Sequence, residues 1–335
     1  MPGHDLVVIG ASAGGVEALR EIVRQLPPDF PAAVLAVVHF PADGTSMLPL
    51  ILARRGPLPA VHAEAGAHIR PGTIYVAPPD RHLLVVGGRI HLSRGPRENG
   101  HRPAVDPLFR SAALARGPRV IAVVLSGNLD DGTAGLAVVR HHGGTTVVQD
   151  PADALYPGMP RSAVEAGVAE HVVPLAGLPS LLVELVNREA DVGEGPPAND
   201  ALDRYEDAIT GMRELPTAGE PPGEPAGLVC PECRGSLFEI RDGELVRYRC
   251  RVGHTYGSET LVEHQTRTVE EALWTALQVL NERAALSRRT AARMDQRGSP
   301  RVAERFRASA LESDRLAAVV NSVLRTGPTE GVGEN

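Results

Sequence analysis

Short, continuous apolar runs recur from residue 5 to about residue 186, and each is followed by a glycine or polar loop and then by a segment of helical period. The clearest runs are residues 6–9, 33–39 and 120–125, and such runs are typical of strands buried on both faces of a sheet. Residues 16–26 have helical spacing and end at Pro27-Pro28. This alternation predicts an α/β fold built around a doubly wound, mostly parallel sheet.

Composition and pattern divide the chain into four parts. The first part, residues 1–190, also contains weaker strand signals, at 74–77, 145–148 and 171–173, and a predicted β-hairpin at 83–92. Residues 191–227 are rich in Gly, Pro, Glu and Asp, which predicts a linker with a short helix at 200–212. Residues 228–256 contain all the cysteines, and residues 257–328 predict an antiparallel helical hairpin that turns at Gly298.

The chain contains no lysine, so all 34 of its basic residues are arginines. This excludes Schiff-base chemistry, pyridoxal enzymes and phosphate-binding loops that depend on a lysine. The net charge of −7 and the absence of a basic stripe argue against nucleic-acid binding. The N-terminus has no signal-peptide pattern and no apolar run approaches about 18 residues, so we expect a cytoplasmic protein without membrane insertion.

A serine lies in the glycine-rich segment GASAGG, residues 10–15, between the first predicted strand and the first predicted helix. Ligands bind outside the carboxyl ends of the strands in open α/β sheets, and the N-terminus of the next helix offers backbone N–H groups there. These conditions suit a nucleophile beside an oxyanion hole. The same residues also fit a purely structural turn in which Ser12 caps the helix.

Two other predicted strand ends carry a histidine and a pair of aspartates. His39 ends the run at 33–39, and Asp130 and Asp131 follow the run at 120–125. Because the carboxyl ends of parallel strands meet at one edge, these residues suit the roles of general base and of the carboxylate that orients it, beside Ser12. Each also fits a structural role, His39 as a core histidine and the aspartates as a solvated turn.

Five separated motifs resemble the catalytic domain of chemotaxis protein-glutamate methylesterases of the CheB type. The motifs are IGASAGG (9–15), His39 with Pro41, HRPAVD (101–106), LSG and DG within 125–132, and GMPR (158–161). They cover residues 5–186 in collinear order. The resemblance implies a doubly wound parallel sheet, a Ser–His–Asp triad, and hydrolysis of glutamyl methyl esters on methyl-accepting chemotaxis receptors. It also implies deamidation of receptor glutamines as a second activity.

The resemblance assigns roles to individual residues. Ser12 is the nucleophile, His39 is the base, and Asp131, which directly precedes the glycine of its loop, is the acid. The backbone N–H groups of Ala13 and Asn128 are expected to bind the oxyanion, and catalysis is expected to need no cofactor. Further substrate contacts are expected at His101, Arg102, Met159 and Arg161. Structural hydrogen bonds and ion pairs are the alternative role of His101 and the two arginines.

Two departures from the family pattern bear on regulation and substrate. Family members commonly begin with a phospho-acceptor receiver domain, and the residues before Leu6 leave no room for one, so we expect no such regulation within this chain. The family's Ser-Thr and Gly-Met-Gly positions are Ser12-Ala13 and residues 127–129, Gly-Asn-Leu, in this sequence. These changes alter side chains and leave backbone donors in place, so they are expected to affect substrate preference.

The three cysteines lie close to one histidine. CPEC (230–233) and the pair Cys250 and His254 flank a predicted hairpin, and two such pairs supply four N and S ligands for tetrahedral Zn²⁺. We therefore predict a structural zinc site at Cys230, Cys233, Cys250 and His254. His264 is the weaker choice of ligand because it falls inside a helical pattern. The segment and the helices after it resemble modules that accompany some methylesterases of this family.

Other functions stay open at this stage. A dinucleotide-binding dehydrogenase is disfavoured because the glycines do not have the Rossmann spacing and His39 stands where an acidic residue is expected. A non-catalytic signalling scaffold, with a protein partner bound to the helical hairpin, fits the C-terminal parts. An esterase that acts on another substrate fits the same triad.

Overall fold

The protein is described by a computed structural model over residues 3–41, 44, 46–190, 200–213 and 223–326. It divides into two compact units, Met1–Leu261 and Val262–Asn335. A seven-stranded parallel sheet forms the centre of the first unit, in the order β3-β4-β2-β1-β7-β8-β9. Its strands are β1 (Leu6–Ala11), β2 (Ala33–Val38), β3 (Ala60–His62), β4 (Ile74–Val76), β7 (Val120–Val124), β8 (Thr145–Gln149) and β9 (His171–Val173). The doubly wound α/β fold is therefore confirmed.

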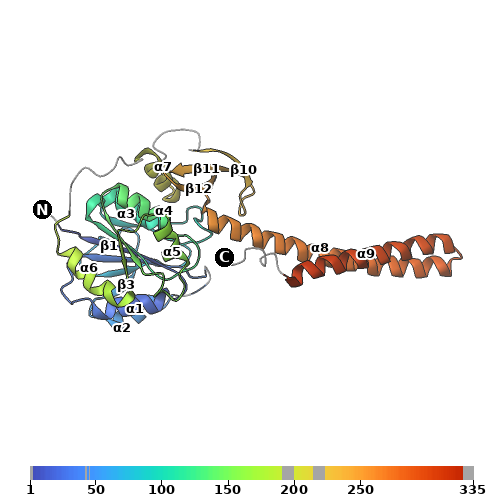
Figure 1. Ribbon diagram of the computed structural model, residues 1–335, viewed down its shortest axis with the longest axis horizontal. Helices are drawn as coiled ribbons and strands as arrows, with labels where there is room; N and C mark the ends of the chain where they lie inside the picture. The colour runs from blue at the N-terminus through green and yellow to red at the C-terminus, as the bar shows by residue number, and fades with distance from the viewer. Residues whose placement is uncertain (1–2, 42–43, 45, 191–199, 214–222, 327–335) are drawn as a thin grey trace. The chain divides into compact units, whose positions relative to one another are not determined.

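Helices cover both faces of the sheet (Figure 1). On one face lie α1 (Gly15–Gln25), α2 (Leu48–Arg55) and α6 (Leu178–Val186), and on the other α3 (Val105–Arg116), α4 (Thr133–His141) and α5 (Gly158–Glu165). Short 3₁₀ turns precede β7 and α6, at Gly117–Arg119 and Leu175–Gly177. The predicted hairpin around Gly87-Gly88 is confirmed as β5 (His82–Val86) and β6 (Arg89–Ser93), which pair antiparallel.

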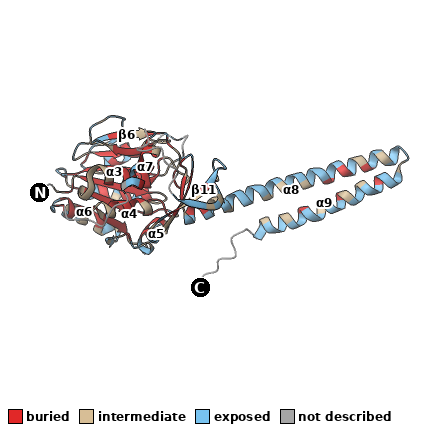
Figure 2. Ribbon diagram, turned by 90° about the horizontal axis from the view of Figure 1, so that it is seen from above, coloured by how far each residue is buried: buried red, intermediate tan, exposed pale blue. Residues whose placement is uncertain are grey.

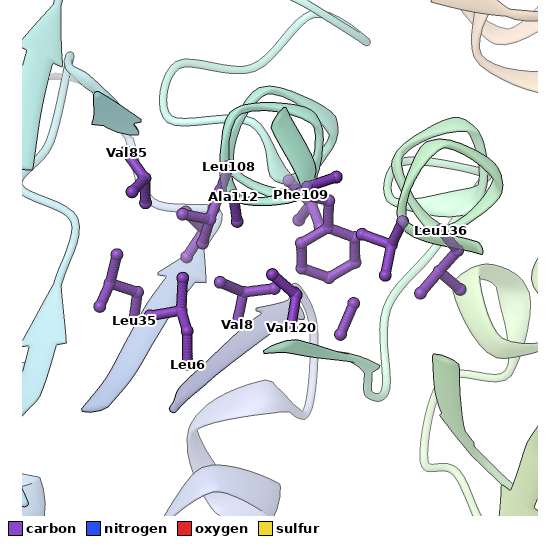
Figure 3. Packing of buried hydrophobic residues seen from close by; sticks show 14 of the residues in the cluster. Leu6, Val8, Leu35, Val85, Leu108, Phe109, Ala112, Val120 and Leu136 are labelled. Atoms are coloured by element: carbon purple, nitrogen blue, oxygen red, sulfur yellow. The ribbon is translucent and has the colours of Figure 1, made fainter. Parts of the chain in front are cut away.

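Apolar residues of the strands alternate between two clusters, one on each face of the sheet. Figure 3 shows Leu6, Val8 and Leu35 of the sheet beneath Leu108 and Phe109 of α3. Val7 and Ile9, the neighbours of Val8 in β1, belong to the cluster on the opposite face. Because both faces are buried, the strands appear in the sequence as uninterrupted apolar runs.

The order of the strands in the sheet changes direction at β1. The strands β2, β4 and β3 lie on one side of β1, and β7, β8 and β9 lie on the other. β2 pairs with one edge of β1, and β7 pairs with the other. Connections that leave β1 and β7 on opposite sides open a crevice at the carboxyl ends of these strands. The predicted Ser12, His39 and Asp131 follow β1, β2 and β7 respectively, so all three lie at this crevice.

A second sheet of four antiparallel strands follows in the same unit. It consists of β10 (Glu224–Val229), β11 (Ser236–Asp242), β12 (Leu245–Cys250) and β13 (Thr255–Gly257). The predicted linker lies partly outside the described residues, at 191–199 and 214–222. Its described part contains α7 (Asp200–Thr210), which packs on α3, and the first four residues of β10, a strand that the linker prediction missed.

Two long helices form the predicted antiparallel helical hairpin. They are α8 (Ser258–Gln296) and α9 (Pro300–Thr326). Small residues at seven-residue intervals are buried in it, and most other positions of both helices are exposed (Figure 2). These small residues are Ala284 and Ala291 in α8 and Ala303, Ala310 and Ala317 in α9. Within the described residues, no helix combines the length and the apolar character that crossing a bilayer requires. The last predicted positions of the hairpin, 327–328, lie outside the described residues.

Candidate active site

The turn after β1 presents Ser12 at the crevice. Gly14 caps α1 with a φ of 73°, a left-handed conformation that favours glycine. The Ser12 N–H donates to the Ser126 carbonyl at 3.0 Å, and Ser126 Oγ donates to the Ala13 carbonyl at 2.8 Å. At Gly127 a Cβ atom would lie 2.9 Å from Ser12 Cβ and 2.1 Å from Met159 Sδ. Only glycine therefore lets the loop after β7 approach the serine this closely.

His39 and Asp131 form the predicted base–acid pair. His39 Nε2 lies 2.8 Å from Asp131 Oδ2, and the two side chains are 6% and 2% exposed. Since a carboxylate only accepts hydrogen bonds, Nε2 carries the proton and the lone pair of the neutral ring is on Nδ1. The ring atom Nδ1 of His39 is buried without a hydrogen-bond partner among the described residues, on a residue that lines the same pocket as Ser12.

Several donors converge on the Asp131 carboxylate. Oδ2 also accepts from the Val105 N–H at 2.8 Å, and Oδ1 accepts from Asn99 Nδ2 at 2.9 Å and from the Asp106 N–H at 3.2 Å. Burial raises the pKa of Asp131, but the hydrogen bonds from His39, Val105 and Asn99 outweigh burial and lower it below its usual range. Asp131 is therefore ionised at neutral pH and fixes the orientation of the imidazole.

Asp106 is a second buried carboxyl beside the acid. Its Oδ1 accepts from the N–H groups of Gly132 and Gly135, at 3.0 and 2.7 Å, and so ties the start of α4 to α3. Burial and the neighbouring charge of Asp131 raise the pKa of Asp106 well above its usual value. The two carboxyls thus have opposite shifts, as expected when like charges share a site.

The pocket at Ser12 has a volume of about 410 Å³. It is lined by Ser12, His39, Phe40, Pro41, Arg97, Gly100, His101 and Arg102. The His101 ring stacks on the His39 ring with centroids 3.7 Å apart and planes 11° apart. Arg102 Nε donates to Asp80 Oδ1 at 2.9 Å, so this arginine also joins the segments on either side of the β5–β6 hairpin. The pocket therefore brings together a serine, two stacked histidines and two arginines.

The other predicted substrate contacts lie elsewhere around the crevice. Within the described chain, Ala13, Asn128, Met159 and Arg161 are not among the residues that line this pocket. No hydrogen bond joins the amide N–H of Ala13 or of Asn128 to another described residue. Met159 is fully buried and packs against Gly127, and Arg161 is exposed on α5.

Sequence reasoning assigned no role to three residues that the structure brings to this site. Asp106 belongs to the HRPAVD motif, which was a usable signal. Asn99 has a φ of 51°, a conformation that asparagine tolerates well, and its side chain is 5% exposed. Arg97 lines the pocket. The roles of Arg97 and Asn99 depend on contacts between distant segments, which a single sequence does not reveal.

The predicted metal ligands form one cluster in the second sheet. The ligand atoms of Cys230, Cys233, Cys250 and His254 all lie within 4.8 Å of one another. Cys233 Sγ is 3.5 Å from Cys250 Sγ, and His254 Nδ1 is 3.7 and 3.5 Å from the sulfurs of Cys230 and Cys250. Tetrahedral Zn²⁺ with Zn–S bonds of about 2.3 Å requires ligand separations of about 3.5–3.8 Å. The far nitrogen of His254, Nε2, lies 3.3 Å from Glu232, as in many carboxylate–histidine–metal arrangements.

Comparison with known proteins points to one family. Residues 7–182 match the family described as CheB methylesterase. A protein-glutamate methylesterase/protein-glutamine glutaminase of Nocardioides sp. is 44% identical over 192 residues, which are 56% of this chain and 52% of that protein. The protein-glutamate methylesterase FrzG of Myxococcus xanthus is 40% identical over 187 residues, 56% of each chain. The chain thus spans about half the length of these curated relatives.

A solved structure resembles the same region. The crystal structure of the Thermotoga maritima CheB methylesterase catalytic domain aligns with a TM-score of 0.53 and 37% sequence identity. The alignment covers 56% of this chain and 100% of that one. The parallel-sheet domain therefore aligns with the whole length of that catalytic domain.

Proposed function

This chain belongs to the CheB methylesterase family, and from that premise we propose that it is a protein-glutamate methylesterase with Ser12 as its nucleophile. The observation that carries the proposal is that Ser12 and His39 line one pocket while His39 Nε2 donates to Asp131 Oδ2 at 2.8 Å. The methylesterase and glutaminase names of the relatives support the choice of reaction.

The reaction follows from the protonation states of these residues. His39 Nδ1 removes the proton from Ser12 Oγ, which attacks the γ-carbonyl carbon of a glutamyl methyl ester. The tetrahedral oxyanion accepts hydrogen bonds from the backbone N–H groups of Ala13 and Asn128. As the C–O bond to the methoxy group breaks, His39 returns the proton and methanol leaves. Water then hydrolyses the acyl-enzyme by the same route, and ammonia replaces methanol when glutamine is the substrate.

Substrate recognition is proposed from the walls of the pocket. Arg97 and Arg102 line it, and a receptor segment rich in glutamate carries the opposite charge. His101 stacks on the base and limits the rotation of its ring. Because Ser12 is partly exposed in this pocket, a glutamyl side chain that projects from a receptor segment has access to it. Methyl-accepting chemotaxis receptors are therefore the proposed partners.

We propose that the Cys₃His cluster binds a structural Zn²⁺ ion. Four protein ligands complete a tetrahedron and leave no position for substrate, so the metal takes no part in ester hydrolysis. Zinc stabilises the fold of this small sheet when bound. Three reduced cysteines in one cluster also suit a reducing compartment, which supports a cytoplasmic location.

A fluorophosphonate probe, which reacts with activated serines, tests the assignment of the nucleophile. We expect one labelled peptide, the one that contains Ser12, and no labelling of Ser12→Ala. Ser180→Ala serves as the matched control because Ser180 is exposed on α6, and it should be labelled like the original protein. Labelling of a different serine, or equal labelling of Ser12→Ala, would reject the proposed nucleophile.

A further inference from the structure

The four-stranded sheet with the Cys₃His cluster, residues 223–257, is called the metal module below. It contacts the loops that carry the catalytic acid, and the contacts come from β13, the strand directly after His254. The Asn99 N–H donates to the Thr255 carbonyl at 2.7 Å, and the Gly257 N–H donates to Asn99 Oδ1 at 2.9 Å. Backbone and side chain of Asn99 are thus both bound to β13.

The same asparagine holds the acid. Its Nδ2 donates to Asp131 Oδ1 and to Asp106 Oδ2, at 2.9 Å each. A single buried amide therefore joins the backbone of the metal module to the carboxylate that orients His39. An amide donor on an ionised carboxylate forms one of the stronger hydrogen bonds in proteins. Loss of this hydrogen bond therefore leaves the Asp131 carboxylate less firmly held.

Asp130, the residue before the acid, is tied to the residues that follow β13. Asp130 Oδ2 accepts from the Glu259 N–H at 3.2 Å, and Asp130 Oδ1 accepts from the Thr260 hydroxyl. Gly257 has no room for a side chain, because a Cβ atom there would lie 2.0 Å from Asp130 Oδ2 and 2.6 Å from its Cγ. Residues 255–260 thus hold Asp130 directly and Asp131 through Asn99.

A buried ion network fixes the metal module to the parallel-sheet domain. Glu206 of α7 pairs with Arg247 at 2.8 Å and with Arg249 at 3.1 Å, both from β12, and with Arg110 of α3 at 3.5 Å. Arg110 also pairs with Glu98, the neighbour of Asn99, at 2.7 Å. All of these side chains are at most 6% exposed. Residues so deeply buried indicate a permanent interface within the chain.

We propose that the metal module positions the catalytic acid, and that Asn99 is the positioning residue through which it acts. The metal ligands Cys250 and His254 close the turn that leads into β13, so an ordered metal site places Gly257 against Asn99. Asn99 in turn keeps Asp131 on His39 Nε2. This inference rests on the proposed Ser12–His39–Asp131 chemistry and adds to it a role for the C-terminal part of the chain.

Three variants test the proposal from both sides of the contact. Asn99→Gly removes the bridging amide and accepts the positive φ without strain. Gly257→Ala forces Asp130 to move, and Thr260→Val removes the hydroxyl that donates to Asp130. Thr268→Val is the matched control, because Thr268 is exposed on the same helix and donates only to the His264 carbonyl.

The first measurement is the rate at which a fluorophosphonate labels Ser12 as a function of pH. A lost hydrogen bond to a charged group predicts labelling about 10- to 100-fold slower in Asn99→Gly. We also expect slower labelling in Gly257→Ala, because the added methyl group displaces Asp130 beside the acid. A displaced Asp131 also stabilises the imidazolium less, so the rise of labelling with pH moves to lower pH, which simple unfolding does not produce.

The second measurement is amide hydrogen exchange at residues 128–135, which reports on the acid loop whether or not ester is hydrolysed. We expect faster exchange there in Gly257→Ala, in Thr260→Val and after chelation of the metal, with β1 unchanged and Thr268→Val like the original protein. Unchanged exchange and an unchanged labelling profile in Gly257→Ala would overturn the proposal. If Ser12 of the original protein is not labelled, the proposed function fails, and hydrogen exchange alone decides this inference.

Discussion

The parallel-sheet domain and the metal module, two parts of one compact unit, are stabilised in different ways. The sheet of the former buries an apolar cluster on each face. The buried apolar cluster at the latter has five members, Cys230, Leu237, Cys250 and Tyr256 of the module and Leu261 of α8. Two of these five, Cys230 and Cys250, are predicted metal ligands. A sheet with so little apolar area does not offset the entropy of ordering its chain, so we propose that the module depends on a bound metal and on its ionic contacts with the larger domain.

Removal of the metal should have the largest effect on stability, and it should affect the metal module but not the parallel-sheet domain. Structural zinc sites contribute about 10–16 kcal/mol to the folding of small zinc domains at neutral pH. We expect a chelator to abolish hydrogen-exchange protection in β10–β13 and to leave β1 and β7 protected. Re-addition of zinc should restore protection. Protection that survives complete removal of the metal would show that the module has sufficient stability without it.

Replacement of Glu206 by glutamine should have the next largest effect. It leaves Arg110, Arg247 and Arg249 buried without their shared carboxylate, and breaking a buried ion pair on one side costs about 3–5 kcal/mol. We expect faster proteolysis of the module and a lower free energy of unfolding in urea. Asp314→Asn is the control, since its pair with Arg288 is exposed and such pairs contribute at most about 1 kcal/mol. Equal effects of the two changes would contradict the importance of the network.

A cavity in the apolar core should destabilise the parallel-sheet domain independently of the metal. Leu35 in β2 is fully buried, and replacement of a buried leucine by alanine costs about 2–5 kcal/mol. Leu50→Ala serves as the control because Leu50 is 42% exposed. Urea unfolding monitored in β1 should show the loss for Leu35→Ala with zinc present or absent. A loss that disappears on chelation would mean that the two regions are not stabilised separately.

Mild acid should have the smallest effect on the ion pairs that join the metal module to the parallel-sheet domain. Burial raises the pKa of Glu206, but Arg247, Arg249 and Arg110 outweigh it and lower the pKa from 4.5 to about 2. A carboxyl with a depressed pKa in the folded state contributes stability above about pH 4.5 and loses it as the pH falls toward 2. We expect protease resistance of α7 and β12 to stay constant from pH 7 to about 4.5 and then to decline. In Glu206→Gln this part of the decline should be missing.

The strands and the candidate site residues could be predicted from the sequence, whereas the contacts between regions could not. Buried strands such as β1 and β7 were predictable because burial on both faces leaves uninterrupted apolar runs. Ser12, His39 and Asp131 follow from strand ends and motifs, and the pair of His39 with Asp131 is present in the structure. The triad as a catalytic unit stays a prediction.

The contacts between regions were not predictable from one sequence. Arg110 and Glu206 are 96 residues apart, and nothing local distinguishes a buried charge from an exposed one. The helix at 200–212 was predicted, but its position against α3 was not. Asn99 bonds to Gly257, 158 residues away. Only the folded chain brings such pairs together, which is why the support of Asp131 was missed.

The most direct test of the central claim is methanol release from methylated chemoreceptor membranes, with the zinc-loaded protein compared with its Ser12→Ala form. We expect the original protein to release methanol and the variant, with unchanged thermal stability, to lose about 10⁴-fold or more in rate. Equal release by both forms would contradict the mechanism. No release by either form would contradict the receptor substrate, and would favour a different ester or the role of a signalling scaffold.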